Sequence, residues 1–384
     1  MGGNLPAGKL LFARTTSASP PDWRNPMSWL RNTWYAVAWS DEVESTPFGR
    51  RILNDAIVFF RDGAGRLAAI GGRCPHRFAP LAMGKIVDDT LECPYHGLRF
   101  DKSGTCVHNP HGGGRIPMNA RVPKYRIAER WGLVWLWPGD PDAADEDKIP
   151  DLSHLLRDDL GHVRGYMGMQ ANYMLGVDNL IDLSHAQFVH GDRLMSNNFD
   201  DAKVAVEQNG NDVTNRLSIP NSSVPPALRS RVPAEIDVVD YWLDSTWRVP
   251  SVVTNDVGIT LPGRPREEGQ RSFGVHIVTP ETERSSHYLF AHSRNYAVGD
   301  PLIDEKIREW QRVGFSEQDK PIIEATARMM GEETDPLALR PVLLPTDAAA
   351  VRARRLLSKL IDEETKACGE VSIPLDAVRR TLSG

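Results

Sequence analysis

The sequence has 384 residues, of which 41% are hydrophobic and 25% charged, a composition ordinary for a globular protein with room for two domains. Its net charge of -6 at pH 7 argues against a nucleic-acid partner, because proteins that bind nucleic acid concentrate positive charge on one face. The longest apolar stretches fall far short of the roughly 20 residues that cross a bilayer, and the start lacks a full signal-peptide core, so we expect a cytoplasmic protein without a membrane partner.

Short β-like runs separated by turns dominate the chain from Met27 to Asp140, and they predict a compact all-β domain over residues 27–140. The clearest runs are Trp34–Trp39, Ala56–Phe60 and Leu133–Trp137. Residues 1–26 contain several prolines and little apolar periodicity, so we expect them to form a loose N-terminal extension.

Residues 141–384 are predicted to form a second domain in which strands and helices are segregated. Three stretches look helical, and one long stretch between them looks extended. The helical stretches are Tyr173–His190, Asp304–Met330 and Asp347–Glu364, and the extended one is Val204–Arg294. Segregated helices and strands predict an α+β fold for this domain.

Cysteine and histidine occur at ligand spacing twice in the first domain, in Cys74-Pro75-His76 and in Cys93-Pro94-Tyr95-His96. Two thiolates and two imidazoles also suit zinc, which takes the same atoms tetrahedrally. Both pairs are embedded in glycine- and proline-containing turns of a β domain, whereas finger-type zinc units are much smaller. The pattern resembles that of Rieske [2Fe-2S] domains, which implies that Cys74 and Cys93 hold one iron while His76 and His96 hold the other.

A second candidate metal site lies in the second domain, where His185 and His190 follow Asn179 and Asp182. Five residues of a regular helix rotate a side chain by about 500°, which leaves the two imidazoles about 140° apart. The pair can share a metal only if the helix departs from regular geometry. Either the helix loosens just before His190, ahead of Gly191, or it contains a π-bulge.

Asn179, Asp182 and His185 recur every three residues and should lie near one face of this helix. A polar face on an otherwise apolar helix suggests a buried site. Two histidines need a carboxylate to complete the facial triad that binds ferrous iron and leaves positions open for dioxygen. Spacing alone leaves four carboxylates open as the third ligand: Asp300, Asp304, Asp319 and Glu324.

From Met27 to about Glu364 the chain resembles the α subunits of Rieske non-haem iron oxygenases, in the group of dicamba monooxygenase, vanillate O-demethylase and toluenesulfonate methyl-monooxygenase. The matching motifs lie in both domains: Cys74–Leu81, Cys93–Leu98, Val107–Gly112, Val177–His190, His276–Glu283 and Glu317–Lys320. The resemblance implies an all-β Rieske domain followed by a catalytic domain of the helix-grip type with an antiparallel sheet. It also implies that Asp319 binds a mononuclear Fe(II) beside His185 and His190.

The resemblance further implies a homotrimer in which Asp182 carries electrons from the Rieske histidine of a neighbouring subunit to the mononuclear iron. We therefore count Asp182 and its helical neighbour Asn179 as candidate catalytic residues. Because the sequence has no glycine-rich dinucleotide fingerprint, we expect a separate ferredoxin, a reductase or both to supply electrons from NAD(P)H.

Three candidate substrate contacts also follow from the resemblance. Asn255 and His276 fall where related enzymes hold a substrate carboxylate, and Trp310 falls where an indole lines the same pocket. Asn255 and a protonated His276 would bind an anionic acid by charge-assisted hydrogen bonds. The sequence departs from its relatives at Asp256, where they are apolar, and at His292, where they have a small residue.

The expected function is that of a terminal oxygenase component that uses dioxygen to oxidise a small aromatic acid. The expected reaction is O-demethylation of a methoxybenzoate-like substrate with release of formaldehyde. Hydroxylation of an aryl methyl group or of the ring at the same iron is the alternative. A Rieske-type electron carrier is a different class of protein and would need only the first domain.

Overall fold

The computed structural model describes residues 29–191, 202–225, 228–229 and 232–370, with side chains up to residue 367. The predicted extension, residues 1–26, lies outside the described residues. Among the helices in the described ranges, none combines the length and the hydropathy of a membrane span.

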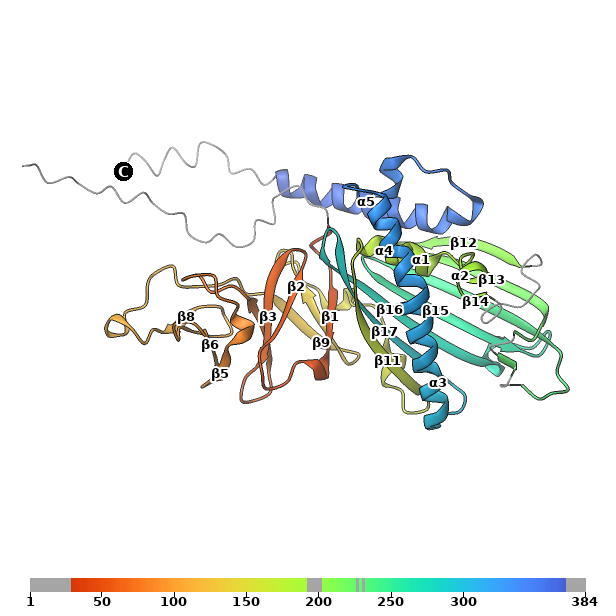
Figure 1. The fold of residues 1–384 in the computed structure, drawn as a ribbon, viewed down its shortest axis with the longest axis horizontal. Helices are drawn as coiled ribbons and strands as arrows, with labels where there is room; N and C mark the ends of the chain where they lie inside the picture. Colours follow the sequence, from red (N-terminus) through yellow and green to blue (C-terminus); the bar gives the residue numbers. More distant parts are fainter. Residues whose placement is uncertain (1–28, 192–201, 226–227, 230–231, 371–384) are drawn as a thin grey trace, which may run out of the picture.

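The N-terminal part consists of three small antiparallel sheets, as its alternation of apolar runs and turns predicts (Figure 1). Their strand orders are β1-β10-β9, β2-β3-β4 and β5-β6-β7-β8. The strands are β1 Tyr35–Trp39, β2 Phe48–Ile52, β3 Asp55–Arg61, β4 Leu67–Gly71, β5 Lys85–Val87, β6 Thr90–Glu92, β7 Arg99–Phe100, β8 Cys106–His108, β9 Arg126–Arg130 and β10 Leu133–Trp137.

The C-terminal part is built on one seven-stranded antiparallel sheet of order β11-β17-β16-β15-β14-β13-β12. Its strands are β11 Gly161–Met169, β12 Lys203–Asn209, β13 Asp212–Ser223, β14 Val238–Arg248, β15 Val252–Thr260, β16 Gln270–Thr282 and β17 Ser285–Arg294. The helices are α1 Tyr173–Ile181, α2 Ala186–Val189, α3 Pro301–Gln311, a π-helix Arg312–Asp319, α4 Lys320–Met329 and α5 Ala348–Glu370. In Figure 1, α3 and α4 run as one long rod across the sheet, which confirms the predicted α+β class.

The predicted continuous helix Tyr173–His190 is wrong, because α1 ends at Ile181 and α2 begins at Ala186. Asp182 has an extended backbone with ψ 107°, and its Oδ1 accepts hydrogen bonds from the Ser184 backbone N–H (2.8 Å) and hydroxyl (2.6 Å). Such local side-chain bonds compete with the helical hydrogen-bond ladder. The break therefore lies before both histidines.

One hydrophobic core runs through both parts of the chain. It joins Tyr35 and Phe59 of the small sheets to Tyr173 of α1 and Val278 of β16. Hydrogen bonds cross the same boundary: the backbone N–H groups of residues 53 and 54 donate to the carbonyl oxygens of residues 280 and 281, at 3.1 and 2.9 Å. The two parts are therefore packed as one unit rather than tethered by a linker.

Candidate metal centres and substrate pocket

The two cysteine-bearing loops at the β5–β8 end of the molecule are closed in the same way. In each loop the cysteine N–H donates to the carbonyl five residues on, and the N–H four residues on donates back to the cysteine carbonyl, at 2.8 to 3.1 Å. The residue four after each cysteine, Phe78 or Gly97, has a positive φ of 60° or 71°. Glycine adopts this conformation freely, whereas Phe78 is held in it by its loop.

These matched turns bring the predicted cluster ligands together. Cys74 and Cys93 are buried, while His76 is exposed and lies with its ring centroid 4.5 Å from that of His96. Burial and the neighbouring Cys93 raise the pKa of the Cys74 thiol to about 11. Two inward thiols beside two outward imidazoles form a donor set that fits a [2Fe-2S] cluster, with one iron buried and the other near solvent.

The second group of ligands lies between α2 and the π-helix. His185 Nε2 and His190 Nε2 lie 3.6 and 3.4 Å from Asp319 Oδ1, and one donor atom from each residue lies within 4.8 Å of the others. Burial raises the pKa of the Asp319 carboxyl, against the influence of the two histidines. Asn179 donates to Asp319 Oδ1 at 3.3 Å. Two imidazoles and one carboxylate fit a facial triad for ferrous iron, which leaves further positions open.

Neighbouring groups fix which nitrogen of each imidazole faces the triad. His185 Nδ1 lies 2.5 Å from the backbone oxygen of Asp182, and His190 Nδ1 lies 2.9 Å from Gln318 Oε1. Both Nε2 atoms are thereby left for a metal, as is common where a second polar group orients a histidine ligand. The Asp182 carboxylate does not make this contact within the chain. Gln318 was not predicted, although it is next to Asp319 in the sequence.

The segment that carries the carboxylate has an irregular helix geometry, whereas the predicted π-bulge concerned the helix of the two histidines. Residues Arg312–Asp319 form a π-helix, in which the N–H of Lys320 donates to the carbonyl of Phe315. Pro321 follows at the start of α4 and has no N–H to continue an α-helical ladder. At the histidine pair, α2 ends at Val189 and Gly191 has φ 59°, so the predicted end of the helix before Gly191 is confirmed.

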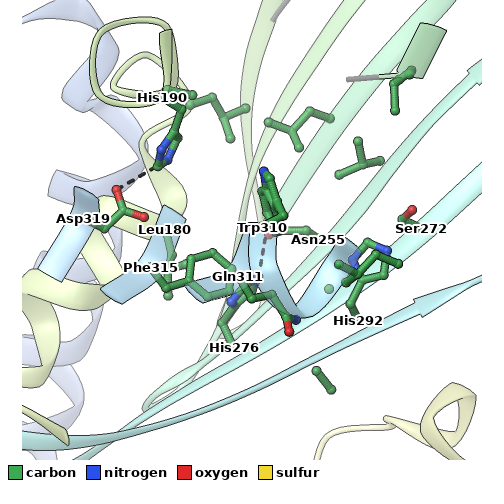
Figure 2. Close-up of a pocket in the computed structure, with 18 of the residues that line it drawn as sticks. Leu180, His190, Asn255, Ser272, His276, His292, Trp310, Gln311, Phe315 and Asp319 are labelled. Carbon is green, nitrogen blue, oxygen red and sulfur yellow. Dashed lines mark hydrogen bonds and ion pairs between the residues drawn. The ribbon is translucent and has the colours of Figure 1, made fainter. Parts of the chain in front are cut away.

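The triad opens onto a cavity of about 770 Å³ between the sheet and the helices α1 to α3. Alternate residues of β15 and β16 line it, because successive side chains of a strand point to opposite faces. On β16 these are Gln270, Ser272, Gly274 and His276, and on β15 they are Asn255 and Val257. In Figure 2, His190 and Asp319 face each other at one end, while His292 and Ser272 lie at the other. The volume suits a small organic molecule.

Asn255 and His276, the predicted contacts of a substrate carboxylate, meet in this cavity. The Asn255 amide nitrogen lies 3.3 Å from His276 Nε2 (Figure 2). His276 Nδ1 lies 2.7 Å from the hydroxyl of Tyr288. Burial lowers the pKa of His276 to about 4, so the imidazole is neutral at neutral pH. The binding of an acid by Asn255 and a protonated His276 stays a prediction.

Trp310 also lines the cavity, on α3, and its ring packs edge-on against Phe315 at a centroid distance of 5.3 Å. His292 lines the cavity as well. Asp256 does not affect the pocket directly, since its carboxylate pairs with Arg271 at 2.6 Å and accepts from Trp242 Nε1 at 3.1 Å on the opposite face of β15.

Two family models match the chain. The Rieske [2Fe-2S] domain matches residues 33–126, and the C-terminal domain of the vanillate O-demethylase oxygenase matches residues 169–363. These matches fall inside the two predicted domains, 27–140 and 141–384, whose outer limits remain predictions.

Similar proteins extend over almost the whole chain. The oxygenase component of dicamba O-demethylase from Stenotrophomonas maltophilia is 39% identical over 87% of this chain and 98% of that protein. The oxygenase component of chloroacetanilide N-alkylformylase from Rhizorhabdus wittichii is 39% identical over 87% of this chain and 96% of that protein. The crystal structure of dicamba monooxygenase bound to 3,6-dichlorosalicylic acid has a TM-score of 0.82 at 39% identity, over 87% and 98% of the two chains.

A Rieske domain joined to a site of two histidines and one carboxylate defines an oxidoreductase with two iron centres, a [2Fe-2S] cluster and a mononuclear non-haem iron. The chain belongs to the Rieske non-haem iron oxygenases, in the group that shares its catalytic domain with the vanillate O-demethylase oxygenases. The predicted family, cofactors and fold class are thus confirmed, and the electron-carrier alternative is not supported.

Proposed function

We propose that this chain is the terminal oxygenase component of a multicomponent monooxygenase that removes a methyl group from a methoxybenzoate-like aromatic acid. One observation carries this proposal: the triad of His185, His190 and Asp319 opens onto a cavity large enough for a small organic molecule. The names of the similar proteins, a dicamba O-demethylase and an N-alkylformylase, support removal of a small alkyl group from a heteroatom.

Ferrous iron at such a triad supplies dioxygen activation. The residues of the chain decide which carbon reacts: the triad lies at one end of the cavity, and the apolar rings of Trp310 and Phe315 form a wall beside it. Insertion of one oxygen atom into a methoxy C–H bond converts the substrate to a hemiacetal, which collapses to a phenol and formaldehyde. The second oxygen atom leaves as water after two electrons and two protons are supplied.

The electrons come from outside the chain in this proposal. A ferredoxin, a reductase or both pass them from NAD(P)H to the cluster held by Cys74, His76, Cys93 and His96. Figure 1 shows strands β5, β6 and β8, which lie beside the cluster loops, on the far side of the small sheets from α2, which lies beside the triad. This separation supports transfer between neighbouring subunits of a homotrimer, with the Asp182 carboxylate at the crossing point.

The test is a screen of isomeric methoxybenzoates and methylbenzoates with the iron-loaded protein and an electron-donating ferredoxin and reductase. Release of formaldehyde that requires dioxygen and NAD(P)H, in equal amount to the phenol formed, supports O-demethylation. If the methylbenzoates give a benzylic alcohol and no ether gives formaldehyde, the reaction is hydroxylation at the same iron instead of O-demethylation. The variant Asp319→Ala is the control that should lose either product.

A further inference from the structure

Helix α3 presents one continuous stripe of side chains to the substrate cavity. Its lining residues follow the i, i+3, i+4, i+7, i+8 pattern of a single helical face: Ile303, Lys306, Ile307, Trp310 and Gln311. Lys306 is exposed and lies one helical turn before Trp310, about 6 Å along the axis. It therefore stands at the solvent side of the same wall that Trp310 forms.

The charges around the cavity are unequally distributed. Among the described residues that line it, Lys306 is the one lysine or arginine, and the two carboxylates are Asp182 and Asp319 at the metal end. Other charged residues of α3 are already paired, Arg308 with Glu305 at 3.1 Å and Asp304 with Arg294 at 2.6 Å. Lys306 forms no ion pair within the described parts of the chain.

The Asn255 and His276 side chains of the cavity are uncharged. Asn255 donates its amide N–H to His276, which in turn donates from Nδ1 to Tyr288, so these three side chains form a neutral chain of hydrogen bonds. The lowered pKa of His276 keeps it neutral. The Asn255 Oδ1 is buried and has no hydrogen-bond partner in the described residues, so this position offers an acceptor to a ligand. An acceptor suits an O–H or N–H group of a ligand.

We propose that Lys306 is the residue that selects an anionic substrate, by binding its carboxylate at the mouth of the cavity, while Asn255 binds an uncharged hydrogen-bond donor deeper inside. This proposal rests on the proposed function, which supplies the aromatic ether that lies between Lys306 and Asn255. Lys306 and Asn255 then bind two polar groups on opposite sides of the substrate's aromatic ring, and the carboxylate bound by Lys306 faces the solvent.

The proposal predicts how affinity depends on the length of the acid. The probes are 4-methoxybenzoate, 4-methoxyphenylacetate and 3-(4-methoxyphenyl)propanoate, each with its neutral amide. Dissociation constants are measured by calorimetry on the iron-loaded protein without an electron donor, so no turnover is needed. In the wild-type protein at least one acid should bind more tightly than its amide, because only the acid pairs with the ammonium group.

Three variants separate charge from shape. Lys306→Met should weaken binding of the preferred acid about tenfold, a loss of about 1.4 kcal/mol, and change binding of its amide less than twofold. Lys306→Arg keeps the charge and should keep most of the preference for the acid. Arg308→Met removes a charge two positions away on the same helix, outside the cavity lining, and should leave the acid-to-amide ratio unchanged.

Equal affinity for every acid and its amide in the wild-type protein overturns the proposal, as does an acid preference that survives in Lys306→Met. Formaldehyde assays on the same probes then test the reaction separately. Loss of acid preference in Lys306→Met without any formaldehyde from the wild type supports the role of Lys306 and contradicts O-demethylation. Formaldehyde from the wild type, with an acid preference that survives in Lys306→Met, supports O-demethylation and overturns the role of Lys306.

Discussion

The imidazole of His276 is buried between β15, β17 and the π-helix, although it also lines the substrate cavity. Its protonation therefore affects the free energy of unfolding. Its pKa is about 4 in the folded chain against 6.5 for an ordinary histidine. The unfolded chain therefore binds more protons between these two values, so the histidine's contribution to stability is complete above about pH 6.5 and is lost as the pH falls toward 4.

We expect His276→Gln to flatten the pH dependence of stability, because glutamine is polar but does not titrate. Between pH 7 and pH 5 the free energy of unfolding of the wild-type protein should fall by about 2 kcal/mol more than that of the variant. Urea unfolding of both proteins at the two pH values measures the difference. Parallel losses in the two proteins would show that His276 already binds a proton in the folded state.

His76 allows a residue-scale test of the cluster ligands. A thiolate adds negative charge where the imidazole is neutral, so His76→Cys should retain a cluster while lowering its midpoint potential. Redox titration followed by visible absorption measures this potential. His108→Cys is the matched control, since His108 lies in β8, in the small sheet next to the cluster loops, and is not a predicted ligand. A potential that stays at the wild-type value in His76→Cys would remove His76 from the ligand set.

At the scale of elements, the π-helix is the feature that positions the carboxylate of the mononuclear site. Pro321 cannot donate a hydrogen bond to the carbonyl of Glu317, which favours the wider helical turn just before α4. We expect Pro321→Ala to let an α-helical bond form there and to move Asp319 away from the two histidines. Mononuclear iron per subunit and oxygenase activity should then fall at least tenfold, while the visible spectrum of the cluster stays unchanged.

Pro301→Ala provides the control, because Pro301 occupies the first turn of α3 and an ordinary α-helix follows it. This variant should keep its full content of mononuclear iron. Iron analysis and cluster absorbance on both proline variants distinguish a local shift of Asp319 from general destabilisation. Full iron content in Pro321→Ala would mean that packing, and not the proline, maintains the π-helix.

The sequence predicts most elements, because strands and helices leave different periodicities. The long extended region Val204–Arg294 and the helical region after Asp304 both agree with the structure. The break at Asp182 was not predicted, since an apolar pattern continues across it and the contact between Asp182 and Ser184, which competes with the helical bonds there, leaves no periodic signal.

The ligands of the cluster were easier to predict from the sequence than the ligands of the mononuclear iron. The cysteine and histidine pairs of the cluster are local motifs, so their spacing in the sequence was enough to predict a common metal site. The third ligand of the mononuclear iron lies far along the chain, and spacing left four carboxylates open until the resemblance to a family indicated Asp319. The neutral state of His276 depends on burial by elements from three regions, and this property has no counterpart in a local sequence pattern.

At the scale of the whole molecule, the proposed assembly can be tested through Asp182. Asp182→Asn keeps the size and the hydrogen-bond acceptor of the side chain but removes its charge. We expect both metals to bind while the reduced cluster reoxidises much more slowly under dioxygen with substrate present. Stopped-flow absorbance measures the rate. Loss of the mononuclear iron from this variant would assign Asp182 a structural role instead, through its bonds to Ser184.

Mixed assemblies test whether electrons pass between subunits. A His76→Ala chain lacks a complete cluster site, and an Asp319→Ala chain lacks a complete triad. If the electron crosses from one subunit to the next, co-refolded mixtures should recover part of the activity, because some interfaces pair an intact cluster with an intact triad. Each variant alone is the control and should be inactive. Mixtures as inactive as the single variants would place both steps within one chain.

The continuous core between the small sheets and the seven-stranded sheet limits how such enzymes can be recombined. Tyr35 and Phe59 pack in the same core as Tyr173 and Val278, and backbone hydrogen bonds join the β2–β3 turn to the end of β16. A chimaera that grafts a foreign Rieske domain onto this catalytic domain would leave a mismatched apolar surface along that boundary. Exchange of redox modules between relatives would therefore succeed only when the matching faces of β3, α1 and β16 are transferred together.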